Sequence, residues 1–255
     1  MLQTLVVKGP FEIVPGVYGL GSELVNWYLV EADDGLVAVD AGLQGYADTL
    51  DADLRSIGHA PEEITALVLT HADGDHVGIA PNLRELGATV YVHADAEERL
   101  AKDGGKTGDA ATIKLLPYLV RPGFLGLIRH FASYRALSAA TLENPTTYRD
   151  GEVLAVPGGP RVIATPGHSP GHCCLLFEDR GALFVGDAFC TLQVVTRKTG
   201  PQLMPAALNV DNERCLESLS AIDPVEAAVT LPGHGEPWRG TPAEATALVR
   251  ERGRT

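Results

Sequence analysis

The sequence lacks the features that mark several large classes of protein. No apolar run approaches the roughly 18 residues that a membrane helix needs, and the amino terminus shows no basic and apolar segment with a small-residue cleavage site. We therefore expect a cytoplasmic protein that has no membrane partner. No repeat of fixed period and no low-complexity tract is present, so neither a solenoid nor a disordered chain is expected.

Positive charge is also in short supply. The chain has 20 lysines and arginines against 33 aspartates and glutamates, which gives a formal net charge of −13 at pH 7. Because nucleic-acid binding draws most of its affinity from basic contacts to phosphates, this balance argues against a nucleic-acid partner. The four cysteines form no CxxC pair and show no disulfide-scaffold spacing, which favours buried thiols in a reducing compartment.

One further catalytic motif is present only in part. Gly105-Lys106-Thr107 is similar to the end of a phosphate-binding loop, but the first glycine of that motif would fall at Leu100, and no strand is predicted before it. We interpret this segment as a surface loop.

What the chain does contain is an alternation of strand-like and helix-like segments. At 255 residues it is long enough for one domain with a full core, and we expect a single domain over residues 1–255. The alternation favours α/β or α+β layering. Strands are predicted at residues 25–30, 36–40, 64–70, 88–93, 161–166, 173–179, 182–187 and 227–234, and helices at 47–57, 79–86, 124–134 and from the capping box at Thr241 onward.

The region 101–150 interrupts this alternation. Five apolar side chains between residues 124 and 134 recur at helical spacing after a Pro-Gly pair, which predicts a helix with one apolar stripe. We interpret the region as a helical insertion that lies over the main body. The stripe either packs as ordinary core or forms a lid with an apolar wall for a substrate, and both interpretations stay open.

The segment LTHADGDHVG, residues 69–78, concentrates two histidines and two aspartates within six residues. Alone it could be a solvated loop. However, His168, Asp187 and His234 also follow predicted strands and stand beside glycines. Strand ends followed by glycine loops often carry sites, because the scaffold is rigid there and glycine lets backbone and ligand approach closely. Imidazole and carboxylate together suit a divalent metal ion.

Five ordered motifs resemble those of the metallo-β-lactamase superfamily, which includes glyoxalase II-like and lactonase-like hydrolases. They are VDAG at 39–42, THADGDH at 70–76 against the family pattern THxHxDH, PGHSPGH at 166–172, GD at 186–187 and GH at 233–234. The resemblance runs through nearly the whole chain. It implies a four-layer αββα sandwich, with helices outside two mixed β-sheets and a two-metal centre at one edge of the sheets.

The resemblance also implies seven metal ligands. They are His71, Asp73 and His168 for the first ion, Asp75, His76 and His234 for the second, and Asp187 as the bridge. The family pattern has histidine at position 73, where this chain has aspartate. Either Asp73 still binds and gives a more neutral centre, or it is too short to reach and only one ion binds. We expect two ions, zinc first, and the carboxylate moves the preference toward manganese or iron.

Such a centre favours acyl hydrolysis. Water between two cations loses a proton near neutral pH and attacks a carbonyl that one metal polarises. Asp75 would orient this hydroxide and could take its proton, then hand it to the leaving group. The expected substrate is a small molecule with a lactone, thioester, ester or β-lactam-like amide bond, the first two being favoured. Two alternatives remain: a mononuclear-iron oxidoreductase for a small sulfur compound, and a metal-binding protein without catalysis.

Several nearby residues are assigned supporting roles. Asp40 is expected to organise the loops beneath the site through hydrogen bonds, and His172 to be a structural hydrogen-bonding residue rather than a ligand. Cys190 is expected to be a small buried hydrophobic residue. His59, His93 and His130 match no partner in the motifs and are interpreted as structural or solvated. The oligomeric state stays open, a homodimer included.

Overall fold

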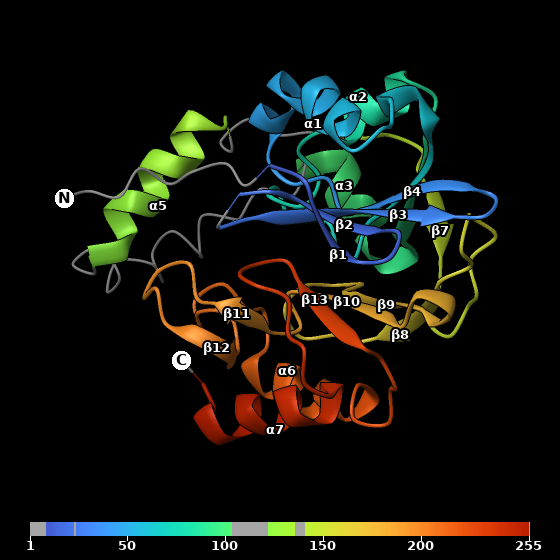
Figure 1. Cartoon of the computed structure of the whole chain (residues 1–255). Helices are drawn as coiled ribbons and strands as arrows, with labels where there is room; N and C mark the ends of the chain where they lie inside the picture. The colour runs from blue at the N-terminus through green and yellow to red at the C-terminus, as the bar shows by residue number, and fades with distance from the viewer. Residues whose placement is uncertain (1–8, 23, 104–121, 136–140, 255) are drawn as a thin grey trace.

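The structure is a computed structural model that describes residues 9–22, 24–103, 122–135 and 141–254. Four layers are stacked in it (Figure 1): helices, a seven-stranded sheet, a four-stranded sheet, and helices again. The αββα sandwich predicted from the sequence is thus confirmed. The Gly105-Lys106-Thr107 segment lies outside the described residues.

The larger sheet keeps the order of the chain. Its strands are β1 (Phe11–Val14), β2 (Val17–Gly21), β3 (Asn26–Ala32), β4 (Gly35–Val39), β5 (Ile64–Val68), β6 (Thr89–His93) and β7 (Thr146–Tyr148). Pairing is antiparallel from β1 to β4 and parallel from β4 to β7, so the sheet is mixed. The strands predicted at 25–30 and 36–40 are confirmed as β3 and β4, which form a hairpin through a turn at Asp33-Asp34.

Three helices cover the outer face of this sheet: α1 (Leu50–Ser56), α2 (Ala80–Glu85) and α3 (Glu97–Asp103). The helix predicted over 47–57 is divided, because a 3₁₀ turn over Gln44–Asp48 precedes α1. In that turn the backbone N–H of Gly45 donates to the carbonyl of Tyr134 at 2.7 Å, a contact from outside the segment that holds the turn in place.

The smaller sheet has the order β13-β10-β9-β8. Its strands are β8 (Arg161–Ala164), β9 (Cys173–Phe177), β10 (Ala182–Gly186) and β13 (Val229–Pro232). A short hairpin, β11 (Cys190–Leu192) and β12 (Thr199–Gln202), lies beside it. Helices α6 (Asn212–Ser218) and α7 (Pro242–Arg252) form the outer layer, and α7 starts at the predicted capping box between Thr241 and Glu244.

The two sheets pack against each other through apolar side chains. Val37, Val68, Phe177, Phe184 and Val229 are 0–1% exposed in the cluster between them. Separate apolar clusters join each sheet to its own helices. Because such interiors are close-packed and change volume only at a cost in stability, loops at the strand ends start from fixed positions.

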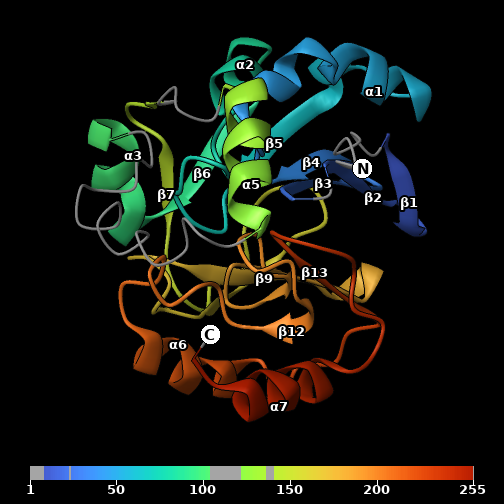
Figure 2. The same ribbon diagram turned by 90° about the vertical axis from the view of Figure 1, so that its left-hand side faces the viewer.

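Only part of the region 101–150 is an insertion outside the main body. β7 pairs in parallel with β6, so the end of this range belongs to the main sheet. Helix α5 (Pro122–Ser133) follows the predicted apolar stripe and stands outside the four layers, in front of the edge of the sheets (Figure 2). Its His130 lies 3.0 Å from Ser22 Oγ. Among the described helices, none is long and apolar enough to cross a membrane.

Candidate metal centre

The predicted ligands come together from the ends of four strands. His71 follows β5, His168 follows β8, Asp187 follows β10 and His234 follows β13. These four side chains are at most 3% exposed. The sheets therefore deliver imidazole and carboxylate groups, far apart in the sequence, to one dry location at the edge of the sandwich.

Two of the imidazoles, those of His76 and His234, are oriented by strong acceptors. His76 Nδ1 donates to Asp40 Oδ2 at 2.9 Å, and His234 Nδ1 donates to the backbone carbonyl of Leu24. A donor at Nδ1 leaves the lone pair on Nε2. Both rings are thus fixed in the tautomer in which Nε2 binds a metal, the arrangement that outer hydrogen bonds give to metal-binding histidines.

His71 and His168 are oriented in the same way by neutral partners. Thr70 Oγ1 donates to Asp40, so it accepts from His71 Nδ1 at 3.0 Å. His168 Nδ1 lies 2.8 Å from Asn209 Oδ1 and donates to it. Here, too, Nε2 keeps the lone pair.

The residues present fit divalent metal ions. The Nε2 atoms of His71, His76, His168 and His234 are buried and make no hydrogen bond in the described part of the chain. Buried polar atoms are rarely left in this state, and four such atoms on one side of the fold require a partner. A divalent cation satisfies them, because imidazole nitrogen and carboxylate oxygen are its ordinary ligands.

Asp187 lies between the two groups of histidines. Its Oδ1 is 3.5 Å from His76 Nε2, and its Oδ2 is 3.2 Å from His234 Nε2 and 3.5 Å from His168 Nε2. One carboxylate thus faces imidazoles that the resemblance assigns to two different ions. This is the position that a bridging ligand requires.

The pKa values of the histidines show that the carboxylates of the site favour positive charge. Burial lowers the pKa of His76, but the carboxylates of Asp187 and Asp40 outweigh it and raise the pKa to about 10. Burial likewise opposes a raised pKa at His168, yet the nearby carboxylates of Asp73 and Asp187 raise it to about 9. His71, which has no carboxylate hydrogen-bonded to it, has a pKa well below its usual range, because burial and the charge of His76 lower it.

Two groups of candidate ligands converge, each with its atoms within 4.8 Å of one another: His71, His168 and Asp187, and then Asp75, His76 and His234. Six of the seven predicted ligands are therefore brought together. Asp40 lies equally close to His71 and His76. Its oxygens already accept from Thr70 and His76 Nδ1, however, so we interpret Asp40 as the organising residue that the sequence predicted.

Asp73, the seventh predicted ligand, is placed differently. Its Oδ2 is 3.4 Å from His168 Nε2, while its Oδ1 is 2.9 Å from Nη2 of Arg99 in α3. It belongs to neither convergent group among the described residues. Sequence reasoning did not identify Arg99, since it lies outside every motif and meets Asp73 only through folding.

Asp75 is the most exposed carboxylate of the set, at 23%, against 3% for Asp187. Its Oδ2 lies 3.6 Å from His234 Nε2. Asp75 therefore lies at the more exposed side of the cluster.

His172 uses both ring nitrogens for structure. Nδ1 contacts the backbone carbonyl of Thr165 at 3.0 Å and so donates to it, and Nε2 accepts from the backbone N–H of Asp187 at 3.0 Å. Burial, helped by the charge of His168, lowers the pKa of His172 to about 3. No lone pair remains for a metal, which agrees with the structural role predicted for this residue.

Two glycines allow the loops to close around Asp187. A Cβ on Gly233 would lie 2.5 Å from Asp187 Oδ1 and from His76 Cε1. Gly186 has φ +47, and a Cβ there would lie 2.5 Å from Thr70 Oγ1. Any side chain at either position would displace a group of the centre.

The other histidines and cysteines lie apart from these ligand groups. His59 contacts Glu63 at 3.0 Å, and His93 contacts Asp150 at 3.2 Å. Cys190 is fully buried, and its Sγ lies 3.5 Å from the carbonyl of Gln202, as expected for a small buried residue. All four cysteines are free.

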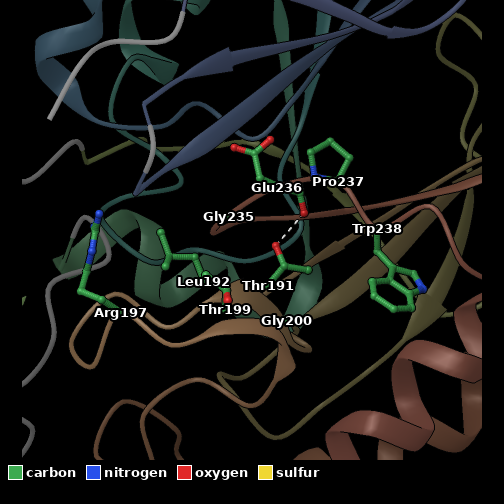
Figure 3. A pocket seen from close by; sticks show the side chains of 9 residues that line it. All are labelled: Thr191, Leu192, Arg197, Thr199, Gly200, Gly235, Glu236, Pro237 and Trp238. Carbon is green, nitrogen blue, oxygen red and sulfur yellow. Dashed lines mark hydrogen bonds between the residues drawn. The ribbon is translucent and has the colours of Figure 1, made fainter.

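A cavity of about 370 Å³ adjoins the loop that carries His234 (Figure 3). The hairpin β11–β12 forms one wall, and residues 235–238 form another. The backbone N–H of Thr191 donates to the carbonyl of His234 at 3.0 Å and connects the cavity wall to the centre. Leu192, Pro237 and Trp238 give the cavity apolar surface.

Fold and site together define a metallo-hydrolase of one known type. Residues 20–234 match the model of the metallo-beta-lactamase superfamily, and the chain belongs to this superfamily. This confirms the family suggested by the five sequence motifs.

Known relatives agree with this assignment. "Probable metallo-hydrolase YflN" of Bacillus subtilis (strain 168) is 27% identical over 248 residues, 90% of this chain and 88% of that protein. An atrochrysone carboxyl ACP thioesterase of Aspergillus fumigatus is 26% identical over 220 residues, 76% of this chain and 65% of that protein. The crystal structure of a metallo-beta-lactamase family protein of Thermus thermophilus superposes with a TM-score of 0.67 at 26% identity, covering 94% of this chain and 80% of the other.

Proposed function

We propose that this metallo-hydrolase cleaves the acyl bond of a small molecule, a thioester or a lactone in preference to a simple ester or a β-lactam-like amide. The observation that carries the proposal is the set of four buried Nε2 atoms without hydrogen bonds around Asp187 in the described part of the chain. The likeness to an ACP thioesterase supports the thioester.

The proposal includes two divalent ions, zinc first, with manganese and iron as the alternatives. His71, His168 and Asp187 would hold one, and Asp75, His76 and His234 the other. When bound, such ions make water acidic enough to be a nucleophile near neutral pH and polarise a carbonyl oxygen. Asp75 would accept a proton from the attacking water and return it to the leaving group.

Apolar surface near the centre favours an acyl chain. Leu192, Pro237 and Trp238 line the cavity beside the His234 loop. Leu125 and Ile128 of α5 are 64% and 48% exposed although both are aliphatic. Exposed apolar surface beside a cavity is typical of ligand-binding sites, so we propose α5 as a lid that covers the acyl part of the substrate.

The proposal extends to the setting of the protein. A net charge of −13 fits a small-molecule substrate better than a nucleic acid or an anionic membrane surface. Four buried free thiols fit the cytoplasm, a reducing compartment. The oligomeric state, with a homodimer as one alternative, can be measured by light scattering coupled to size-exclusion chromatography.

Elemental analysis followed by a substrate screen tests the function. Protein purified without a histidine tag should carry about two divalent ions per chain and should hydrolyse members of a panel of acyl thioesters, lactones, esters and a chromogenic β-lactam. Thiol-dependent oxygen uptake by protein that holds a single iron would favour a mononuclear-iron oxidoreductase instead. Stabilisation by panel compounds without turnover would favour a binding protein.

A further inference from the structure

The carboxylate of Asp73 is shared between the metal centre and a cation of the protein itself. Oδ2 faces His168 Nε2 at 3.4 Å, and Oδ1 is 2.9 Å from Arg99 Nη2. The side chains of Arg99 and Asp73 are 23% and 12% exposed, so water screens their attraction only in part.

This ion pair resists separation. Moving Asp73 away would leave the mostly buried guanidinium of Arg99 without a counter-charge, which is unfavourable in a protein interior. Asp73 would have to move toward His71 and Asp187 to complete the group that His168 forms with them, because it is outside that group in the described structure. Arg99 opposes such a movement.

The other carboxylate of the same loop has no such restraint. Asp75 lies within the group formed with His76 and His234, and among the described residues no lysine or arginine is paired with it. The full negative charge of Asp75 is thus available to a cation. The guanidinium of Arg99, in contrast, offsets the negative charge of Asp73 beside the group that contains His168.

We propose that Arg99 makes the two metal sites unequal, because its ion pair withholds Asp73 from the site formed by His71, His168 and Asp187. This site, called the weak site below, then binds its ion at least about tenfold less tightly than the site of Asp75, His76 and His234, a difference set by one missing ligand. Arg99 acts here as a positioning residue through Asp73. The inference rests on the metal centre of the proposed function.

Metal titration of the apo protein tests the proposal without any activity assay. Zinc is added in competition with a chromophoric chelator, and two dissociation constants are fitted. We expect them to differ by at least about tenfold in the native chain. His168→Ala should remove the weaker event and His234→Ala the tighter one, which assigns each constant to its site.

Arg99→Met releases Asp73 while keeping an apolar stem of similar length. We expect the weak site to tighten at least about tenfold, so that the two constants approach each other. Arg55→Met is the matched control, because Arg55 pairs with Asp51 on the surface of α1 and should leave both constants unchanged. Unchanged or weakened binding at the weak site in Arg99→Met would overturn the proposal.

Asp73→Asn provides a second route if the Arg99 variant does not fold. If Asp73 does not bind the ion, its carboxylate contributes little to zinc affinity. Zinc affinity at the weak site should then change by less than about threefold, which is smaller than the loss seen when a hydrogen bond to a metal ligand is removed. A loss of about 100-fold or more would show that Asp73 is a full ligand and would contradict the proposal. Two equal zinc dissociation constants in the native chain would contradict the proposed role of Arg99 but leave the metal centre standing. If zinc bound at neither site, the metal centre of the proposed function would itself be contradicted.

Discussion

The two groups of candidate metal ligands, called the two halves below, are built differently. On one side His76 is oriented by the carboxylate of Asp40, and Asp75 has no lysine or arginine partner among the described residues. On the other side His168 is oriented by the neutral amide of Asn209, and Asp73 is paired with Arg99. The comparison teaches that residues outside the ligand set decide how much negative charge each half offers to a cation.

Asp187 is the group that the halves share, and its loss should produce the largest effect. Asp187→Asn keeps the size of the side chain but removes the charge that faces His76, His168 and His234. We expect zinc affinity at both sites and kcat/KM to fall by more than about 100-fold, beyond the loss typical of a supporting hydrogen bond. Elemental analysis and initial rates measure this, with the exposed Asp179→Asn as control. Retention of two ions by Asp187→Asn would show that the carboxylate bridges nothing.

Gly233→Ala should damage both halves through sterics. The added methyl would lie 2.5 Å from Asp187 Oδ1 and from His76 Cε1, so one of them must move. We expect zinc affinity to fall by about 10–100-fold, the range seen when support for a ligand is lost. Gly126→Ala in α5 is the control, because a Cβ there meets nothing within 4 Å. Equal zinc affinity in the two variants would mean that the loop at Gly233 moves to accommodate the methyl group without displacing a ligand.

The supporting residues should separate the halves. Asp40→Asn weakens the hydrogen bond that orients His76. We expect the zinc dissociation constant of the tighter site to rise by about 10–100-fold. Asn209→Ala removes only a neutral acceptor from His168, so the weaker constant should change by less than about tenfold. Zinc titration of both variants measures the difference. A larger loss in Asn209→Ala than in Asp40→Asn would reverse the comparison.

The last prediction concerns the stability of the apo protein at low pH, not metal affinity. The folded-state pKa of His172 is lowered to about 3, against about 6.5 when unfolded, so between these values only the unfolded chain takes up this proton. The contribution of His172 is therefore present above pH 6.5 and is lost as the pH falls toward 3, by at most about 1.4 kcal/mol per pH unit. Urea unfolding of the native chain and His172→Gln should give a shallower pH slope for the variant. Parallel slopes would contradict the assignment.

The sequence predicts those parts of the molecule whose signals are local. A continuous β-rich run predicts β5, apolar periodicity predicts α5, and the capping box at Thr241 predicts the start of α7. The strand predicted over 227–234 begins at Val229, since strand ends carry weaker patterns than strand centres. β7 is only three residues long, too short for a period to show, and was missed.

For the site, motifs predict residues but not their partners. The convergence of His71, His168 and Asp187 follows from strand ends that meet at one edge. Arg99 and Asn209 could not be predicted, because each meets its partner across separate elements and neither lies in a motif. Whether Asp73 reaches a metal is decided by such a contact, which explains why the sequence left two alternatives at this position.

Metal-dependent thioester hydrolysis tests the central claim most directly. The native chain is stripped with a chelator, and zinc is added back stepwise while bound zinc and the hydrolysis of a medium-chain acyl thioester are measured on the same samples. The claim predicts that hydrolysis disappears with the metal and returns as the two sites fill, and that Asp187→Asn recovers neither binding nor rate. Hydrolysis that persists in the stripped protein, or a protein with both sites filled that cleaves no acyl compound of the panel, would contradict it.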